Sequence, residues 1–143
     1  MRIEQILHNK GVDVVTVEPG ATVRELVARL REYNLGALVV SSDGRSIDGI
    51  VSERDVVRHL AEDAAVLDRS VSTVMTAEVA TCGPGDTLEG VARLMTDKRI
   101  RHLPVVVDGR LHGIVSIGDV VKTRIDELEF ERGQLEGYIT SGG

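Results

Sequence analysis

The nine residues GIVSERDVV at positions 49–57 occur again as GIVSIGDVV at positions 113–121. Seven of the nine positions are identical. In each stretch an apolar run leads into a serine, and an aspartate stands three residues after it. This pattern is typical of a short strand followed by a helix, because serine caps helices and an acidic residue suits the first helical turn. The two stretches therefore indicate two copies of one structural unit.

The duplication continues upstream of these stretches. Residues 14–45 align with residues 79–110 at an offset of 65, with one extra residue in the first copy near Ser46. The matches include a Pro-Gly pair, a threonine on each side of it and an Asp-Gly-Arg turn. Chance does not readily place both blocks in the same order with a slip of one residue. We infer that the chain is an internal duplication.

Each copy has the pattern of a β-α-β-β-α unit. Short strands are predicted at 12–17 and 79–82, buried strands at 37–41 and 103–107, and return strands at 47–51 and 111–115. Asp-Gly pairs at 43–44 and 108–109 predict hairpin turns. Thr22 and Glu25 form a capping box before the first helix, and Ser52 and Ser116 begin the second helices. The inward helix faces are predicted to carry Val23, Leu26, Val27, Leu30, Val56, Val57, Leu60, Val120, Val121 and Ile125.

One such unit is too small to bury its own sheet. We therefore predict an α/β (α+β) fold in which two units pack sheet to sheet with pseudo-two-fold symmetry. The first unit takes residues 1–66, including an N-terminal segment, and the second takes residues 67–143, including a linker and a C-terminal helix. Residues 71–76 of the linker mirror residues 3–8.

The C-terminal helical pattern extends over residues 119–139 and is longer than one unit needs. Its apolar residues fall near a 3.5-residue repeat. The helix either packs on its own module or forms a dimer contact. Gly133 and Gly137 are expected to weaken or break its end.

The composition excludes several classes of protein. Hydrophobic residues make up 42% of the chain, enough for a core, but there are only two Tyr, one Phe and no Trp. A formal charge of −6 and so few aromatic rings argue against nucleic acid as a partner. No apolar run approaches the length of about 20 residues that crosses a bilayer, and no signal-peptide pattern is present. We expect a cytoplasmic protein with no membrane partner.

No reactive group of residues stands out. The single cysteine, Cys82, cannot form an internal disulfide, and the four histidines show no metal-ligand spacing. A P-loop motif is absent, and no nucleophile with a general base is evident. We expect neither an enzyme nor a metal site.

Three motifs carry a resemblance to a known family. They are Thr-x-x-Pro-x-x-Thr at the start of each copy, His-Leu-Pro-Val-Val at 102–106, and Gly-Ile-Val-Ser-x-x-Asp at the end of each copy. Over about residues 12–125 the chain resembles the CBS-domain pair, also called the Bateman module. The resemblance implies a regulatory module that binds an adenine nucleotide (AMP, ADP or ATP, with NAD as a further candidate) between the paired sheets and catalyses nothing.

The resemblance also implies how the module is assembled. Many members of the family dimerise, so a homodimer is expected, and an unidentified protein partner would receive the signal. The alternative is a structural dimerisation module with degenerate clefts and no physiological nucleotide.

By the same resemblance, two composite clefts hold the ligands. The Asp119 cleft would combine Thr16, Leu35 and Gly36 with His102, Ser116 and Asp119. The Asp55 cleft would combine Thr81, Ile100 and Arg101 with Ser52, Arg54 and Asp55. In each cleft the aspartate would hold the ribose, and the helix N-terminus beside it suits a phosphate.

The two clefts differ in charge. Arg54 precedes Asp55, whereas Gly118 precedes Asp119. We therefore expect the Asp55 cleft to take a polyphosphate and the Asp119 cleft to take a monophosphate aided by His102, or nothing. Plainer explanations stay open: Ser-x-x-Asp is a capping box in its own right, and both Arg54 and the basic run at 98–101 fit solvated surface.

Overall fold

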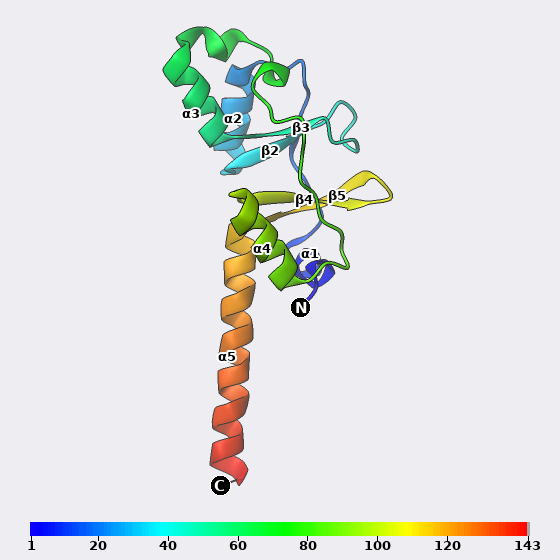
Figure 1. Ribbon diagram of the computed structural model, residues 1–143, viewed down its shortest axis with the longest axis vertical. Coiled ribbons are helices and arrows are strands. Elements are labelled where there is room, and N and C mark those ends of the chain that lie inside the picture. The colour runs from blue at the N-terminus through cyan, green and yellow to red at the C-terminus, as the bar shows by residue number, and fades with distance from the viewer. Residues whose placement is uncertain (143) are drawn as a thin grey trace.

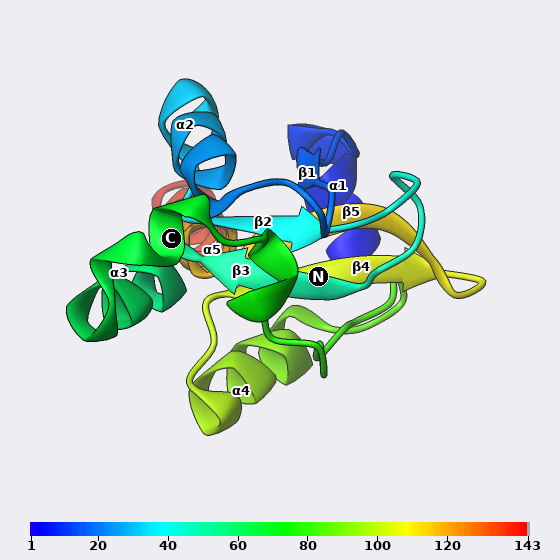
Figure 2. The same ribbon diagram turned by 90° about the horizontal axis from the view of Figure 1, so that it is seen from above.

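In the computed structural model, which describes residues 1–142, two small sheets face each other and the helices cover their outer sides (Figure 1). The elements in chain order are α1 (Ile3–Lys10), β1 (Thr16–Val17), α2 (Val23–Tyr33), β2 (Ala37–Val40), β3 (Gly49–Ser52), α3 (Glu53–Glu62), the 3₁₀ turns η1 (Ala64–Asp68) and η2 (Val71–Thr73), α4 (Leu88–Lys98), β4 (His102–Val107), β5 (Arg110–Ser116) and α5 (Ile117–Gly142). The predicted mixed fold of two repeats is confirmed. Seen from above, the first sheet lies over the second (Figure 2).

The sheets have matching topology. In the first, β1 is parallel to β2 and β2 is antiparallel to β3. In the second, β4 is antiparallel to β5, and Cys82 makes one parallel bridge with Val105 at the place that β1 takes in the first sheet. The strands predicted at 12–17 and 79–82 are therefore too long. Both segments carry the chain from one repeat to the other, so only their last residues reach a sheet (Figure 1).

The two Asp-Gly turns differ. Asp108 and Gly109 both have positive φ, 52° and 76°, and close the tight hairpin predicted between β4 and β5. The tight hairpin predicted at 43–44 is wrong, because an eight-residue loop joins β2 to β3. The carboxylate of Asp43 organises this loop by accepting the backbone N–H groups of Arg45 and Ser46, at 2.8 and 2.7 Å. These bonds lower the pKa of Asp43 to about 2.

Each repeat has its own hydrophobic core, and each core is completed by a segment that precedes a repeat. Helix α1 contributes Ile3, Ile6 and Leu7 to the core of the second repeat. The linker contributes Val71 and Val74 to the core of the first. Helix α1 therefore packs on the second repeat, although the first repeat follows it directly in the chain. The boundary placed between residues 66 and 67 stays a prediction, and residue 143 lies outside the described part of the chain.

The glycine that opens each Gly-Ile-Val-Ser motif makes room for these exchanged segments. A Cβ on Gly113 would lie 2.8 Å from Cδ2 of Leu7. A Cβ on Gly49 would lie 2.6 Å from Sδ of Met75 and 2.8 Å from the carbonyl oxygen of Thr76. Both distances are too short for a side chain, so the backbone can approach its neighbour only at glycine.

The inward helix faces were only partly predicted. Val23, Leu26, Leu30, Val56 and Val120 are buried as expected. The prediction is wrong for the other half of the set, which is exposed: Val27, Val57, Leu60, Val121 and Ile125. Each helix covers a narrow sheet of two or three strands, so one stripe of apolar residues is enough to seal the core and a second stripe faces outward.

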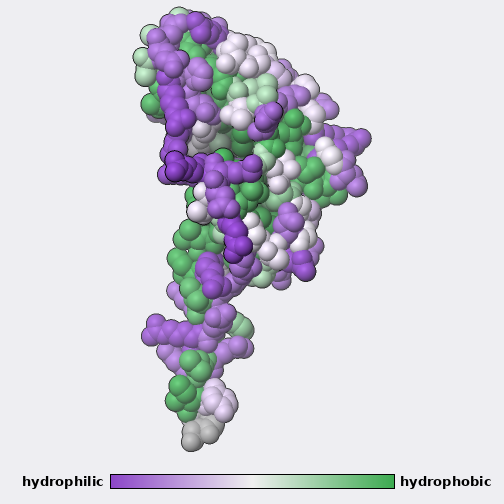
Figure 3. Space-filling model, viewed as in Figure 1, coloured by the Kyte–Doolittle hydropathy of each residue, from purple (hydrophilic) through white to green (hydrophobic). Residues whose placement is uncertain are grey.

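Helix α5 is continuous through Gly133 and Gly137, so the expected break at its end does not occur. Its C-terminal half projects away from the two repeats (Figure 1), and hydrophobic residues follow one side of the projection (Figure 3). Leu135 and Ile139 are 61% and 65% exposed, so this half does not pack on its own module. Among residues 1–142, no helix has the length and apolar composition needed to cross a membrane.

Candidate functional site

The Ser-x-x-Asp motifs form the same structure in both repeats. The backbone N–H of Ser116 donates to Oδ2 of Asp119 at 2.9 Å, and the backbone N–H of Asp119 donates to Oγ of Ser116 at 3.1 Å. Ser52 and Asp55 make the corresponding bonds at 2.8 and 3.2 Å. Both Ser-x-x-Asp motifs therefore form capping boxes in the structure. Within residues 1–142, the hydrogen bonds to both carboxylates are made to Oδ2, and Oδ1 of each aspartate takes no part in the cap.

A residue that the sequence did not suggest lies on Asp119. Nζ of Lys10, the last residue of α1, is 2.7 Å from Oδ2 of Asp119 and 3.0 Å from the carbonyl oxygen of Ile114. Lys10 precedes the duplicated stretch that begins at Val14 and lies 109 positions from its partner, so no local pattern connects them. The mirror between residues 3–8 and 71–76 was the one signal that placed α1 in a repeat-like position.

The carboxylate of Asp119 is held in its charged form. Burial acts to raise its pKa, but the hydrogen bonds from Lys10 and Ser116 outweigh burial and leave the pKa below the ordinary value. An ionised carboxylate accepts strong hydrogen bonds from hydroxyl groups. Asp119 can therefore act as an acceptor for a diol at neutral pH.

His102 is placed between the two repeats. It opens β4 directly opposite Ser116. A Cβ on Gly36 would lie 3.4 Å from Cε1 of His102, so the first repeat meets this ring at a residue without a side chain. Burial, followed by the charge of Lys10, lowers the pKa of His102 against the opposing effects of Asp119 and Glu53. The ring is therefore neutral at pH 7.

The structure thus brings four predicted residues of the Asp119 cleft together: Gly36, His102, Ser116 and Asp119. The remaining two lie on its first-repeat side. Leu35 is exposed just before Gly36, and Thr16 pairs with Val39 in the first sheet. The carbonyl of Gly36 accepts the N–H of Glu53 at 2.9 Å. The ligand-binding role of all six residues stays a prediction.

The Asp55 cleft is less closely assembled. The carbonyl of Arg101 accepts the N–H of Ile117 at 2.8 Å, which repeats the bond made by Gly36. Ile100 packs against the core of the second repeat, and Thr81 directly precedes the bridging Cys82. Arg54 is exposed in the first turn of α3, and Asp55 is half-buried next to it.

A cavity of about 560 Å³ lies in the first repeat. It is lined by α2 and the loop after β2, with Glu25, Arg29 and Asp43 among its charged residues. Thr16 is the one predicted site residue in its wall. Within residues 1–142, no group of three His, Cys, Asp or Glu side chains is placed to hold a metal ion.

Comparison with known proteins identifies the repeat. A family model described as the CBS domain matches residues 4–62 and again residues 71–126. The CBS domain-containing protein CBSX3, mitochondrial, of Arabidopsis thaliana is 37% identical over 126 residues, which cover 85% of this chain and 61% of that protein. This chain therefore spans less than two thirds of that relative's length.

Solved structures of similar proteins have the same fold. The CBS-domain containing protein ATU1752 from Agrobacterium tumefaciens has a TM-score of 0.84 at 42% identity, over 87% of this chain and 99% of that one. The CBS domain pair of protein MJ0100, in complex with 5′-methylthioadenosine and S-adenosyl-L-methionine, has a TM-score of 0.77 over 86% and 98% of the two chains. Its identity is 23%, so this likeness concerns the fold.

Proposed function

This chain belongs to the CBS-domain family, and from that premise we propose that it is a regulatory module that binds an adenine nucleotide, or a related adenosyl ligand, in clefts between its two repeats. It catalyses no reaction, and a separate protein reads its ligand-bound state. AMP, ADP and ATP are the first candidates, and NAD is a further one.

The observation that carries this proposal is the charged carboxylate at the start of α5. Asp119 stands at a helix N-terminus, with the pKa kept low by Lys10 and Ser116. A ribose presents two neighbouring hydroxyls that can donate to such a carboxylate, and hydrogen bonds to a charged group contribute about 1.5–3 kcal/mol. Gly36 adds no side chain of its own where the side chains of His102 and Glu53 meet between the repeats. The adenosyl ligands of the MJ0100 pair support the same ligand class.

A thermal-shift panel tests the ligand class. The panel contains AMP, ADP, ATP, NAD(H), S-adenosylmethionine and 5′-methylthioadenosine, with GMP and CMP as base controls. A ligand present at a hundredfold excess over its Kd adds about 2.7 kcal/mol to stability, which is readily seen as a rise in Tm. We expect at least one adenosyl compound, and neither base control, to raise the Tm. Equal shifts for all bases would refute recognition of adenine.

Two arginines suit the Asp55 cleft to a polyphosphate. Arg54 follows the cap of α3, and Arg101 stands at the same place as Gly36 in the other repeat. Their guanidinium groups keep their charge at any physiological pH. We expect Arg54→Ala to weaken ATP binding more than AMP binding. Arg58→Ala, one turn further along the exposed side of α3, is the matched control, and equal losses for both nucleotides would contradict this role.

The absence of catalysis is tested separately. Release of phosphate from ATP is expected to equal the rate in buffer. If phosphate release rises in proportion to protein concentration, and the activity elutes with the protein in gel filtration, this part of the proposal is overturned.

We also propose a symmetric homodimer. The outward stripe on α3 and α5 includes Val57, Leu60, Val121 and Ile125, and Val57 is 65% exposed. Two-fold closure buries such a stripe against its own copy. The same stripe is what favours the alternative of a structural pairing module with degenerate clefts. Light scattering at micromolar concentration is expected to give twice the mass of the chain, and a monomer mass would exclude the homodimer.

The compartment is the last part of the proposal. We propose a cytoplasmic location, to be checked by cell fractionation. Recovery in an organelle fraction, as the name of the Arabidopsis relative would suggest for that protein, would contradict it.

A further inference from the structure

We propose that Lys10 makes the Asp119 cleft selective for a nucleoside monophosphate over the same nucleoside without phosphate. The inference rests on the proposed function and assigns a specificity residue on α1, upstream of the duplicated stretch that begins at Val14. The cation comes from α1, an element that contributes to no predicted ligand contact.

The placement of the ammonium group suits a phosphate next to the ribose. Nζ of Lys10 is bonded to Asp119 and to the carbonyl of Ile114, and an ammonium group has three protons to donate. The third remains for a ligand. The 5′-phosphate of a nucleotide is one sugar ring away from the hydroxyls that Asp119 would hold. The side chain of Lys10 is 34% exposed, so solvent and ligand can reach it.

Lys10 need not leave Asp119 for a ligand to bind. The lysine and the cap of α5 both use Oδ2 of the carboxylate. A ribose hydroxyl can therefore approach Oδ1. The neutral ring of His102 beside it adds no charge at pH 7, so Lys10 is the cation in direct contact with Asp119.

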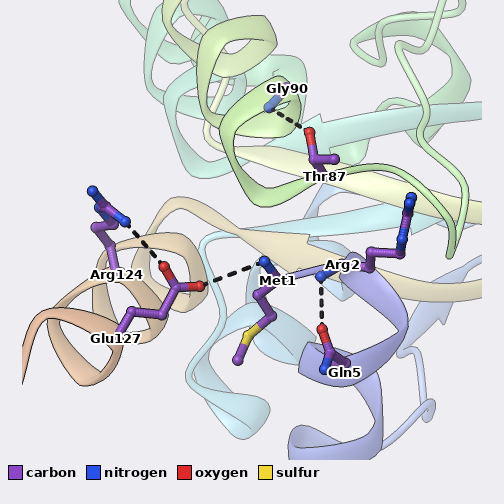
Figure 4. A network of polar contacts seen from close by, with 7 residues as sticks. All are labelled: Met1, Arg2, Gln5, Thr87, Gly90, Arg124 and Glu127. Carbon is purple, nitrogen blue, oxygen red and sulfur yellow. Dashed lines mark hydrogen bonds and ion pairs between the residues drawn. The ribbon is translucent and has the colours of Figure 1, made fainter. Parts of the chain in front are cut away.

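The helix that carries Lys10 is firmly anchored. Ile3, Ile6 and Leu7 are buried in the core of the second repeat. At the opposite end of α1, the amino group of Met1 lies 3.8 Å from Glu127 of α5, and the backbone N–H of Arg2 donates to Gln5 at 2.8 Å (Figure 4). Lys10 is thus presented by a fixed element rather than by a mobile tail, which lowers the entropy lost when it binds.

The duplication does not give the Asp55 cleft an equivalent cation. Residues 3–10 match residues 71–78 at an offset of 68, since Ile3, Ile6 and Leu7 have the same packing roles as Val71, Val74 and Met75. At this offset the counterpart of Lys10 is Glu78. The two clefts therefore differ at the position of Lys10 and Glu78, in addition to the difference between Arg54 and Gly118.

The test compares AMP with adenosine by calorimetry. All variants carry Asp55→Ala, so that binding reports the Asp119 cleft. Lys10→Met, which keeps most of the side-chain length and removes the charge, is expected to weaken AMP about tenfold and to change adenosine less than about twofold, because one charged hydrogen bond is lost. Lys10→Arg is expected to restore most of the AMP affinity.

Arg110→Ala is the matched control. It removes one exposed positive charge from the opposite end of β5. Equal weakening of AMP by Arg110→Ala would show a general effect of net charge, and equal weakening of AMP and adenosine by Lys10→Met would show a structural role; either result overturns the proposal. So does tighter binding of both ligands to Lys10→Met, which would mean that Lys10 competes for Asp119. Failure of the unmodified chain to bind either ligand would instead refute the proposed function.

Discussion

Replacing Gly49 by alanine tests the exchange of segments between the two repeats. The new Cβ would lie 2.6 Å from Sδ of Met75 and 2.8 Å from the carbonyl oxygen of Thr76, where ordinary contact begins at 3.4 Å. Met75 can move its side chain, but Thr76 is fixed by two backbone hydrogen bonds with Ile50, at 3.0 and 2.9 Å. The linker must therefore retreat from β3 or strain those bonds. Overpacking of this kind costs about 1–3 kcal/mol.

Urea unfolding followed by circular dichroism measures this cost. Gly20→Ala is the matched control, because a Cβ there meets nothing within 4 Å and the residue has no positive φ. Its stability is expected to be unchanged or slightly raised, since alanine restricts the unfolded chain. Gly113→Ala should fall between the two, because its Cβ would meet only the side chain of Leu7. A Gly49→Ala protein as stable as Gly20→Ala would refute the close approach of the linker to β3.

Three further predictions concern single side chains. Asp55→Ala is expected to weaken ATP binding by about 1.5–3 kcal/mol in calorimetry and to weaken it more than Asp119→Ala does; the reverse order would contradict the assignment of the polyphosphate to the Asp55 cleft. Because the folded pKa of His102 lies below its ordinary value of 6.5, its contribution to stability is present above pH 6.5 and is lost as the pH falls through the folded pKa. Lys10→Met should raise the pKa of His102 in an NMR titration. An unchanged pKa would show that the charge of Lys10 does not act on His102. Burial raises the pKa of Cys82 to about 11, so iodoacetamide should label it at pH 8 only after unfolding; rapid labelling of the native protein would contradict its burial.

Local signals in the sequence predicted the elements whose structure is set locally. Thr22 and Ser52 cap their helices as predicted, and the Asp108-Gly109 turn closes its hairpin. The tight hairpin predicted at Asp43 and Gly44 is wrong because the Asp43 carboxylate binds the backbone of Arg45 and Ser46 and organises an eight-residue loop between β2 and β3.

The parts that could not be predicted depend on contacts between segments far apart in the chain. Periodicity placed Val56 and Val57 on one inward face, yet only Val56 meets the core, because the width of the sheet decides how much of a helix is covered. Lys10 lies before the duplicated stretch that begins at Val14, so a comparison of the two copies could not assign it to a cleft. The pairing of Lys10 with Asp119 needs the exchange of α1 onto the second repeat.

Calorimetry on the unmodified chain and on the Asp55→Ala, Asp119→Ala double variant tests the central claim most directly. The account predicts that at least one of AMP, ADP, ATP and NAD(H) binds the unmodified chain with a Kd below millimolar, and that removing both carboxylates weakens that ligand by about tenfold to a hundredfold or more. No heat of binding from any of these nucleotides at millimolar concentration, or equal affinity for the double variant, would contradict the claim that the chain senses nucleotides through these two aspartates.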